Sequence, residues 1–426
     1  MILENIYIIQ CPFFFMKGIF VIIDGVADEP CSVLGGKTPL EVANTPNLDA
    51  LAEKSKIYSC HSVGKGIAPE SSSAVMSLLG YESNVVSRGI LETIGAGVKI
   101  KNGDLALRSN FATIDNWHNK RIVDRRAGRT LTSWEAKQLA KAINGKRIHE
   151  KFRFEFIPTI GHRGVLIFRG GFSDNVSNVD PFYSEGKVAS KGDKLLQSKS
   201  FDDEDDSNLS AELINKFVKH CFDVLHSHPV NINRVKKGLY PANIVLCRDA
   251  GSSIPRLKKV KGRWLALGYM PLEVGIAKVS GMEVYRFRYP KLRGIDSYKH
   301  LYKGLNRAIK NAKRMLWWYK NKYDYFYIHF KETDVPGHNG NPKDKVRMIE
   351  MIDKGFFRYI RKIIKDNKLI VCADHTTSCR QKMHTSHPVP VMVYNSQNSG
   401  KKRYSESFVR GDEIMGKDVL KRFLYK

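Results

Sequence analysis

The chain has 426 residues, of which 42% are hydrophobic and 10% aromatic, a composition that is typical of folded globular proteins and excludes extended disorder. Its formal net charge of +27 is large, but Lys and Arg are scattered over the chain without the dense block of a nucleic-acid-binding tail. We therefore interpret the charge as a generally lysine-rich composition and expect no nucleic-acid partner, while a site for a phosphorylated anionic substrate is compatible with it.

The N-terminal stretch "MILENIYIIQCPFFFMKGIF" is apolar, but Glu4, Pro12 and Lys17 interrupt it, whereas a spanning helix needs ~20 nearly continuous apolar residues. We expect no membrane anchor. The stretch also lacks the basic segment and cleavage site of a signal peptide, so residues 1–15 are a possible extension before a start at Met16. Seven cysteines with irregular spacing predict reduced thiols in a cytoplasmic protein.

The first third of the chain alternates between strand and helix. "GIFVIIDG" (18–25) predicts a buried parallel strand with Asp24 at its carboxyl end, and "TPNLDALAEKS" (45–55) predicts a helix. "APESSSAVMSLLGY" (68–81) predicts a helix of small residues with serines at its N-terminus, where backbone N–H groups can hold an anion. The segment therefore places a hydroxyl group at an anion site.

The pattern changes between residues 105 and 265. "TSWEAKQLAKAI" (132–143) opens with a capping box, and "RFEFIPTIGHRGVLIFRGG" (153–171) alternates like a β-hairpin. The acidic "DDEDD" (202–206) predicts a solvated loop before the amphipathic helix "LSAELINKFVKHCFDVLHSHP" (209–229). We predict an α+β domain over 105–265, inserted into an α/β core that consists of 1–104 and 266–426.

After residue 266 the sequence returns to strand and helix alternation, with strands expected at "YDYFYIHFKETD" (323–334), "KLIVCAD" (368–374) and "PVPVMVY" (388–394). This alternation predicts a mainly parallel central sheet flanked by helices. The basic segment "KHLYKGLNRAIKNAKRMLWWYK" (299–320) predicts an amphipathic helix on the outside of that sheet. We expect its Trp317 and Trp318 to pack in the core, because aromatic residues at helical spacing usually face inward.

Three separate stretches end a predicted strand with side chains that bind metals. Because the carboxyl ends of parallel strands meet in one crevice, these ligands can converge. Carboxylate with neutral imidazole suits Zn, Mn or Co better than a purely oxygen-based set does. Each motif alone has a simpler explanation as a turn or a capped loop, but their joint occurrence favours a site for two ions. The candidate ligands are Asp24, Asp334, His338, Asp374, His375 and His384.

Two neighbouring ions can bind a phosphoryl group between them, so the sequence should also contain a nucleophile. Ser71 fits, because its hydroxyl group lies at a predicted helix N-terminus beside phosphate-binding amides. Cys372 and Cys379 are interpreted as bystanders, since Cys372 lies within a predicted strand and a Cys-x6-Cys spacing is unusual for zinc.

Taken together, these segments resemble the archaeal-type cofactor-independent phosphoglycerate mutases of the alkaline phosphatase superfamily. The resemblance covers nearly the whole chain and includes "GIFVIIDGVADEP", "APESSSAVMSLLGY", "SRGILETIGAGV", "IVDRRAGR", "GHRGVLIFRG", "ETDVPGHNGNP" and "ADHTT" followed by "HTSHPVPV". It implies an alkaline-phosphatase-like α/β core with an inserted domain. It also implies two divalent ions (Mn, Co, Zn or Mg) and no requirement for 2,3-bisphosphoglycerate.

The resemblance also implies how the ligands divide between the ions. One ion is expected to bind Asp24, Ser71, Asp374 and His375, and the other Asp334, His338 and His384. His384 is preferred to His387 because the family pattern places the ligand first in the His-(Ser/Thr)-x-(Asn/Asp)-Pro-Val-Pro motif. Ser71 is preferred to its neighbours because it lies ten residues before Tyr81 of "LLGY".

The implied reaction converts 3-phosphoglycerate and 2-phosphoglycerate into each other through a phosphoserine enzyme, a step of glycolysis and gluconeogenesis. The expected clamp on the substrate, from the inserted domain, comprises Asp124, Arg125, His162, Arg163 and Arg248, although "CRDAG" departs from the family's Arg-Gly-Ala-Gly at Asp249. The alternative is a metal-dependent phosphatase or another phosphotransferase of the same superfamily. The partner is expected to be a small molecule, with no membrane involved.

Overall fold

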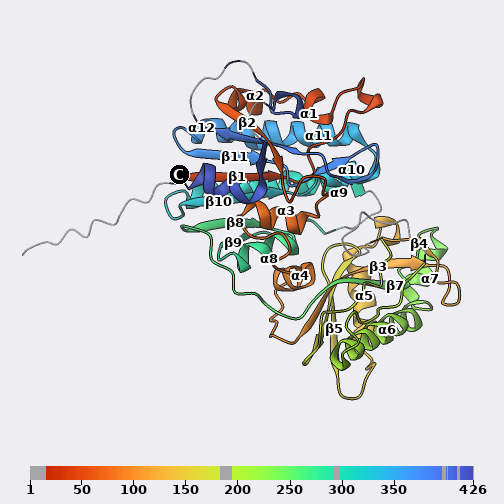
Figure 1. Ribbon diagram of the computed structural model, residues 1–426. Helices are drawn as coiled ribbons and strands as arrows, with labels where there is room; N and C mark the ends of the chain where they lie inside the picture. Colours follow the sequence, from red (N-terminus) through yellow and green to blue (C-terminus); the bar gives the residue numbers. More distant parts are fainter. Residues whose placement is uncertain are drawn as a thin grey trace, which may run out of the picture.

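In the computed structural model, the described residues are 16–182, 194–291, 297–395, 400, 402–409 and 413–425. The possible extension at residues 1–15 lies outside them. The described residues form two large sheets, each with a hydrophobic core of its own, and a two-stranded ribbon; Figure 1 shows the smaller of the two large sheets below the larger one.

The larger sheet has eight strands, in the order β15-β2-β14-β11-β1-β10-β8-β9. Its central strand β1 pairs in parallel with both β10 and β11, and in this sheet only β14 runs against its neighbours. The predicted α/β core with a mainly parallel sheet is confirmed. The strands are β1 (Gly18–Ile23), β2 (Ser55–His61), β8 (Trp264–Gly268), β9 (Glu283–Arg286), β10 (Tyr325–Phe330), β11 (Lys368–Cys372), β14 (Val389–Tyr394) and β15 (Glu413–Met415).

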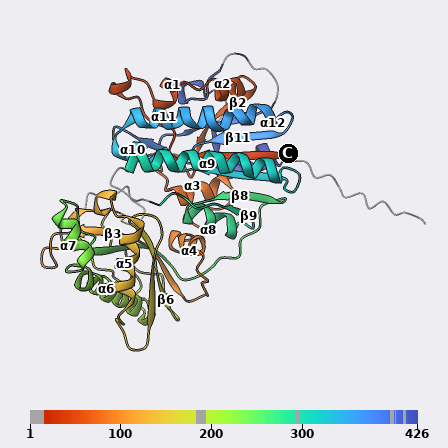
Figure 2. The ribbon, with the colours of Figure 1, turned by 180° about the vertical axis from the view of Figure 1, so that it is seen from behind.

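Helices cover both faces of this sheet, as expected where parallel strands are buried on both sides. One face carries α1 (Pro39–Val42), α2 (Pro46–Ala52), α9 (Ser297–Tyr319), α11 (Pro342–Ile352), the π-turn η3 (Asp353–Phe357) and α12 (Arg358–Ile363). Figure 2 shows α9, α11 and α12 across this face. The other carries α3 (Ser71–Leu78), α4 (Arg88–Gly95), α8 (Pro271–Val279), η5 (Gly416–Asp418) and η6 (Leu420–Leu424).

Short elements complete the core. They are η1 (Ser32–Leu34), α10 (Asp334–Asn339), η4 (Glu406–Phe408) and the two-stranded ribbon of β12 (Thr376–Ser378) and β13 (Met383–Thr385). Helix α10 follows β10, and the ribbon follows β11. Both therefore lie at the carboxyl edge of the central strands.

The smaller sheet is antiparallel, with the order β4-β3-β6-β5 and β7 paired to β3. The predicted hairpin is confirmed as β5 and β6, and the capping box of α5 is present, since Thr132 and Glu135 bond each other's backbone N–H. The elements are β3 (Leu105–Ile114), β4 (Ile122–Asp124), η2 (Ala127–Arg129), α5 (Ser133–Asn144), β5 (Arg153–Pro158), β6 (Arg163–Arg169), α6 (Asp205–Leu225), α7 (Pro229–Lys236) and β7 (Ile244–Gly251). We keep 105–265 as the proposed inserted domain.

Helix α6 corrects one sequence prediction. It begins at Asp205, so the last two residues of the acidic 202–206 segment form its first turn and do not belong to a loop. Carboxylates in the first turn of a helix are stabilised by its dipole, which explains why the helix starts inside the acidic run.

Helix α4 joins the two parts of the molecule. On one side it packs against α8, where a Cβ atom at Gly275 would lie 1.9 Å from the backbone oxygen of Leu91. On the other side it meets β3 and β7, and a Cβ atom at Gly89 would lie 2.4 Å from the oxygens of Ala106 and Asp249. Side chains are thus excluded from both contacts, which hold the smaller sheet close to the core.

We expect Gly275→Ala to destabilise the protein by about 1–3 kcal/mol, because the added methyl group forces α8 away from α4. The measurement is the free energy of unfolding from urea denaturation. Gly171→Ala is the control, because nothing lies within 4 Å of a Cβ atom there. Equal stability of the two variants would contradict the close packing of α4 on α8.

The prediction that Trp317 and Trp318 pack in the core is wrong. Their side chains are 63% and 56% exposed, while Leu305, Ile309 and Leu316 of the same helix α9 are buried. The apolar stripe of α9 already fills its contact with the sheet, so the tryptophans fall on the outer face. Within the described residues, no helix is long and apolar enough to cross a membrane.

Candidate active site

Three neighbouring strands deliver polar side chains to one edge of the larger sheet. Asp24 follows β1, Asp374 and His375 follow β11, and Asp334 lies four residues beyond β10. Because these strands are parallel and adjacent, their carboxyl ends lie together. The convergence that the sequence predicts is therefore present in the structure.

The first group consists of Asp24, Asp374 and His375, and all three side chains are fully buried. His375 Nε2 lies 3.3 Å from Asp24 Oδ1 and 3.3 Å from Asp374 Oδ2, and the backbone N–H of Gly25 donates to Asp374 Oδ1 at 3.0 Å. Burial lowers the pKa of His375 to about 3, so its ring is neutral and its Nε2 can act as a ligand.

Ser71 lies beside this group. It is the first residue of α3 and is buried, and its Oγ lies 3.1 Å from His375 Nε2. The neighbouring Ser73 instead donates its hydroxyl hydrogen to the backbone oxygen of Glu70. The structure thus brings Ser71 to the carboxylates and leaves Ser73 with a local role.

The second group consists of Asp334, His338 and His384. Asp334 lies 3.4 Å from His338 Nε2 and 3.7 Å from His384 Nε2, and these two nitrogens are 3.1 Å apart. Although burial opposes the charge, a hydrogen bond to Asp334 and its negative charge raise the pKa of His384 to about 9. His387 lies elsewhere, since its Nδ1 pairs with the Thr385 hydroxyl.

The donor atoms of both groups fit divalent cations. Both Oδ atoms of Asp24 and Oδ2 of Asp374 are buried and have no hydrogen-bond partner among the described residues. Lys331 pairs with Asp24, but one lysine does not balance both buried carboxylates of this group, and a bound cation would remove the cost of the remaining charge. The groups are adjacent, because the rings of His375 and His384 stack with centroids 3.7 Å apart.

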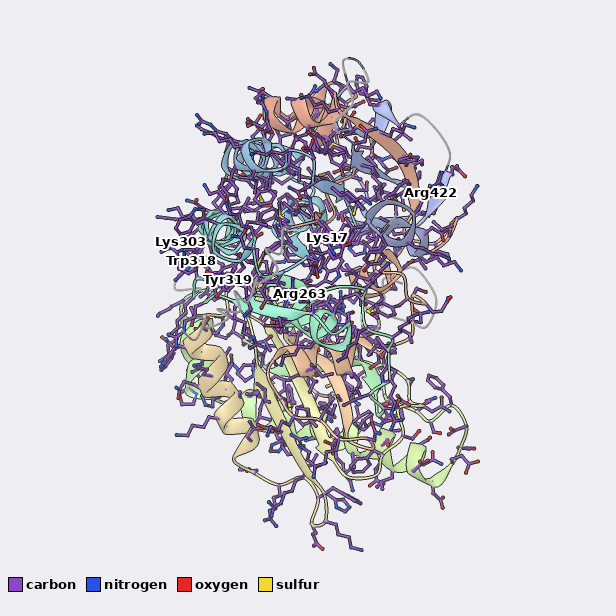
Figure 3. All side chains as sticks on the ribbon, turned by 90° about the vertical axis from the view of Figure 1, so that its left-hand side faces the viewer. Lys17, Arg263, Lys303, Trp318, Tyr319 and Arg422 are labelled. Atoms are coloured by element: carbon purple, nitrogen blue, oxygen red, sulfur yellow. The ribbon has the colours of Figure 1, made fainter. Side chains whose placement is uncertain are left out.

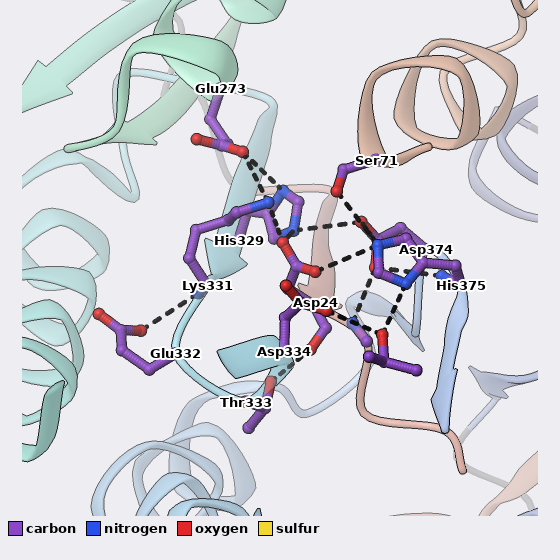
Figure 4. Close-up of polar contacts among 12 residues, drawn as sticks. Asp24, Ser71, Glu273, His329, Lys331, Glu332, Thr333, Asp334, Asp374 and His375 are labelled. Atoms are coloured by element: carbon purple, nitrogen blue, oxygen red, sulfur yellow. Dashed lines mark hydrogen bonds and ion pairs between the residues drawn. The ribbon is translucent and has the colours of Figure 1, made fainter. Parts of the chain in front are cut away.

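A buried cluster on the other side of Asp24 was not predicted from the sequence, and Figure 4 shows it beside the first group. His329 Nε2 lies 3.3 Å from Asp24 Oδ2, and Lys331 pairs with both Asp24 and Glu273. His329 and Lys331 lie in "IHFKETD", shortly before Asp334, and this position is the sequence feature that could have pointed to them. No such feature pointed to Glu273, because it lies on α8, in another part of the chain.

A cavity of about 200 Å³ opens onto Ser71, Asp334, His338 and His384. Its far wall is strongly basic and comes largely from the smaller sheet and α4. Its arginines are Arg88, Arg108, Arg125, Arg126, Arg129, Arg163 and Arg248. Such a wall suits an anion with several oxygens, because guanidinium groups bind carboxylate and phosphate in pairs of hydrogen bonds.

Carboxylates hold some of these arginines in place. Asp180, fully buried, accepts hydrogen bonds from Arg125 Nη2 at 2.7 Å and Arg248 Nη1 at 2.9 Å. On α4, Arg88 pairs with Glu70 at 2.6 Å. Although burial opposes ionisation, Arg88 lowers the pKa of Glu70 to about 2, so this carboxylate stays charged. The arginines are therefore fixed before a ligand arrives.

The "DRRAGR" turn holds a strained backbone at the cavity wall. Ala127, Gly128 and Arg129 all have positive φ angles of 46°, 67° and 56°. Strain of this kind, costly for residues other than glycine, is common at binding sites. Asp124 stabilises the turn, because its Oδ1 accepts from the backbone N–H groups of Arg126 and Gly128.

The structure places four of the five predicted substrate-binding residues at the cavity. Arg125, His162, Arg163 and Arg248 line the cavity, whereas Asp124 is not among the described residues that do so. Burial and the positive charge of Arg163 hold the pKa of His162 well below its usual value, so its ring is neutral. Asp249 has a φ angle of 55°, which explains why a glycine is natural at this position of the motif.

Comparisons with known proteins agree with this geometry. Residues 52–231 match the family model for 2,3-bisphosphoglycerate-independent phosphoglycerate mutase, and residues 277–416 match that of the metalloenzyme superfamily. The Aeropyrum pernix 2,3-bisphosphoglycerate-independent phosphoglycerate mutase is 35% identical over 90% of this chain and 92% of its own. The chain belongs to this family. The predicted resemblance to the cofactor-independent phosphoglycerate mutases is therefore confirmed.

Other relatives of this mutase family agree. The Thermococcus kodakarensis enzyme of the same name is 35% identical over 88% of each chain. Among solved structures, the Thermoplasma acidophilum cofactor-independent phosphoglycerate mutase has a TM-score of 0.57 at 27% identity, covering 96% of this chain and 99% of its own. A Pyrococcus horikoshii protein has a TM-score of 0.71 at 26% identity, covering 96% and 97%.

Proposed function

We propose that this member of the mutase family converts 3-phosphoglycerate and 2-phosphoglycerate into each other through a phosphoserine at Ser71. The observation that carries the proposal is the cavity, where a wall of arginines lies together with Ser71 and the second group of candidate metal ligands, and the first group adjoins Ser71 through His375. A phosphorylated carboxylic acid presents two anionic groups, one for the arginines and one for the serine.

We assign one divalent ion to Asp24, Ser71, Asp374 and His375 and a second to Asp334, His338 and His384. Bound ions would withdraw charge from the phosphoryl oxygens and make the serine hydroxyl easier to deprotonate. The buried Oδ2 of Asp374, which accepts no hydrogen bond among the described residues, and the neutral ring of His375 support this assignment. Mn, Co, Zn and Mg are the candidate ions.

In the proposed reaction, Ser71 Oγ forms a bond to phosphorus while the bond from phosphorus to the glycerate oxygen breaks. The Ser71 hydroxyl loses its proton, and the released glycerate hydroxyl gains one. The glycerate then turns within the cavity, and its other hydroxyl takes the phosphoryl group back from Ser71 Oγ. Each half reaction is the reverse of the other in bonds made and broken, so no external cofactor is consumed.

Retention of glycerate distinguishes a mutase from a phosphatase. We assign this task to the cavity arginines, above all Arg163, because guanidinium groups that line the cavity can hold the carboxylate while the phosphoryl group is on Ser71. Enclosure between the two sheets also limits access of water to the phosphoserine. A metal-dependent phosphatase on the same ligands is the alternative function.

The test follows 3-phosphoglycerate by phosphorus NMR with the metal-loaded enzyme. We expect the 2-phosphoglycerate signal to grow without 2,3-bisphosphoglycerate and with little free phosphate. Free phosphate in the absence of 2-phosphoglycerate would instead identify a phosphatase.

We expect Arg163→Ala to lower mutase activity by about 10²–10³-fold, because one positive charge on the bound anion is lost. The same NMR assay should show a larger share of free phosphate, since glycerate escapes before the second transfer. Arg169→Ala is the control, because this arginine lies in the same strand but pairs with Asp104 outside the cavity. An unchanged ratio of products would argue against Arg163 as part of the clamp.

We also propose that the protein acts in the cytoplasm. The six cysteines among the described residues are all free and buried, in keeping with a reducing compartment. Cys372 and Cys379 belong to this set, which fits their interpretation as bystanders.

A further inference from the structure

A row of cations runs along the outer face of α9 and ends at two exposed tryptophans. The segment 297–322 contains no Asp or Glu. Its exposed residues include, in chain order, Lys299, Lys303, Arg307, Lys310, Arg314, Trp317 and Trp318. We call these seven residues the α9 stripe.

Helix geometry places the stripe on one side of α9. Successive members are mostly three or four residues apart, so they stack one turn above another along about 28 Å of helix. Figure 3 labels Lys303 and Trp318 on the same outward side of this helix. The guanidinium carbon of Arg314 lies 5.6 Å from the Trp318 ring centroid, and the two tryptophan rings lie 6.3 Å apart. Cations and aromatic faces are therefore presented together.

Neighbouring helices widen this positive face. Helix α9 packs beside α11 and the π-turn η3, as Figure 2 shows for the layer of α9, α11 and α12. These elements expose further cations at Lys343, Arg347, Lys354, Arg358 and Arg361. Arg347 pairs with Asp344, and the other four add exposed positive charge to the elements beside α9.

We propose that the α9 stripe binds single-stranded nucleic acid. A strand presents phosphates at regular intervals and bases with free π faces, which matches a line of cations followed by exposed tryptophans. Guanidinium groups such as that of Arg314 add stacking and cation–π contacts to bases. The expectation of no nucleic-acid partner came from the scatter of Lys and Arg over the whole chain, but α9 presents five of them on one exposed face.

An anionic bilayer fits this surface less well. Helices that enter a membrane interface bury their apolar face in it, but the apolar side of α9, with Leu305, Ile309 and Leu316, is packed on the sheet. On the outer face of α9 the large exposed hydrophobic side chains are the two tryptophans at one end. The rest of the stripe offers charge alone.

The stripe is separate from the arginine cavity. Ser297, His300 and Leu301 at the N-terminal end of α9 line the cavity, whereas Trp317 and Trp318 lie at the other end of the helix. The inference therefore does not depend on the proposed mutase reaction. If one of the two proposals fails, the other is still tested by its own assay.

The experiment measures fluorescence anisotropy of a labelled oligouridine of about 20 nucleotides with the full chain at increasing salt. We expect log K to fall with log [salt] with a slope of about −3 to −4, because five cations of the stripe each displace part of a counterion. Binding should persist with saturating 3-phosphoglycerate, since the cavity is not the strand's site.

Two pairs of variants test whether the strand binds to the α9 stripe or to the general positive charge of the protein. Lys303→Glu/Lys310→Glu should weaken binding at least about ten-fold and flatten the salt slope, whereas Lys236→Glu/Lys237→Glu, with the same change in charge on α7, should not. Trp317→Ala/Trp318→Ala should weaken binding about ten-fold at an unchanged slope, whereas Trp134→Ala, which removes an equally exposed ring on α5, should not.

Several outcomes would overturn the proposal. They are the absence of oligouridine binding at low salt, equal losses in the stripe and control variants, and displacement of the strand by 3-phosphoglycerate. Binding to phosphatidylserine vesicles without binding to oligouridine would identify a membrane surface as the occupant instead.

Discussion

Replacement of Ser71 by alanine is expected to reduce mutase activity by at least about 10⁴-fold, because the attacking oxygen is removed. Ser71 Oγ lies 3.1 Å from His375 Nε2, at the meeting point of α3 and the buried carboxylates. The variant should also fail to retain phosphate from labelled 3-phosphoglycerate. Activity is measured by phosphorus NMR and the phosphoenzyme by mass spectrometry of the intact chain.

Ser73→Ala is the matched control, because Ser73 lies in the same turn of α3 but bonds the backbone oxygen of Glu70. Its activity should stay within a few-fold of the wild-type value. Thermal unfolding of both variants separates a catalytic loss from a folding defect. If Ser71→Ala kept near wild-type turnover, the nucleophile would be another residue and the phosphoserine mechanism would be wrong.

Removal of divalent ions by a chelator is expected to abolish activity, and addition of one suitable ion should restore it. The physical reason is the negative charge of the buried Asp24 and Asp374 and of the half-buried Asp334, which a cation balances in the active enzyme. Activity is followed during titration of the stripped enzyme with Mn, Co, Zn or Mg. The number of ions bound is measured by elemental analysis, and two per chain is expected.

Single substitutions should each remove one of the two ions. Asp374→Asn should remove the ion of the first group and His338→Ala the ion of the second, so that each variant binds one ion per chain. His387→Ala is the control, because His387 pairs with Thr385 away from both groups. Full activity after complete removal of metal would contradict the two-metal assignment.

The candidate metal-binding groups could be predicted from the sequence because Asp24, Asp374 and His375 lie within three residues of the end of a strongly hydrophobic strand, and Asp334 lies four residues beyond one. "GIFVIIDG" and "KLIVCADH" are buried runs with a charged residue at the end, and parallel pairing brings such ends together whatever the connecting chain does. The same reasoning found Ser71, since a helix N-terminus is fixed by local signals.

The arginine wall could be predicted only in part. "DRRAGR" and "GHRG" gave Arg125 and Arg163, but Arg88 and Arg108 come from α4 and β3, where nothing local indicates a binding site. Which arginines point into the cavity depends on carboxylates elsewhere in the chain, such as Asp180 and Glu92. Such long-range ion pairs leave no periodic trace in the sequence.

By itself, the sequence determined the α/β class through its hydrophobic periodicity, and the resemblance of its motifs indicated the family, the candidate serine and the two candidate sets of metal ligands. The tertiary structure decided which side of α9 is buried, and therefore that Trp317 and Trp318 face outward. It also decided which cations share a surface. Burial and charge clustering depend on how distant segments pack. The sequence pattern of a helix shows which of its faces is buried only when the element that packs against it is known.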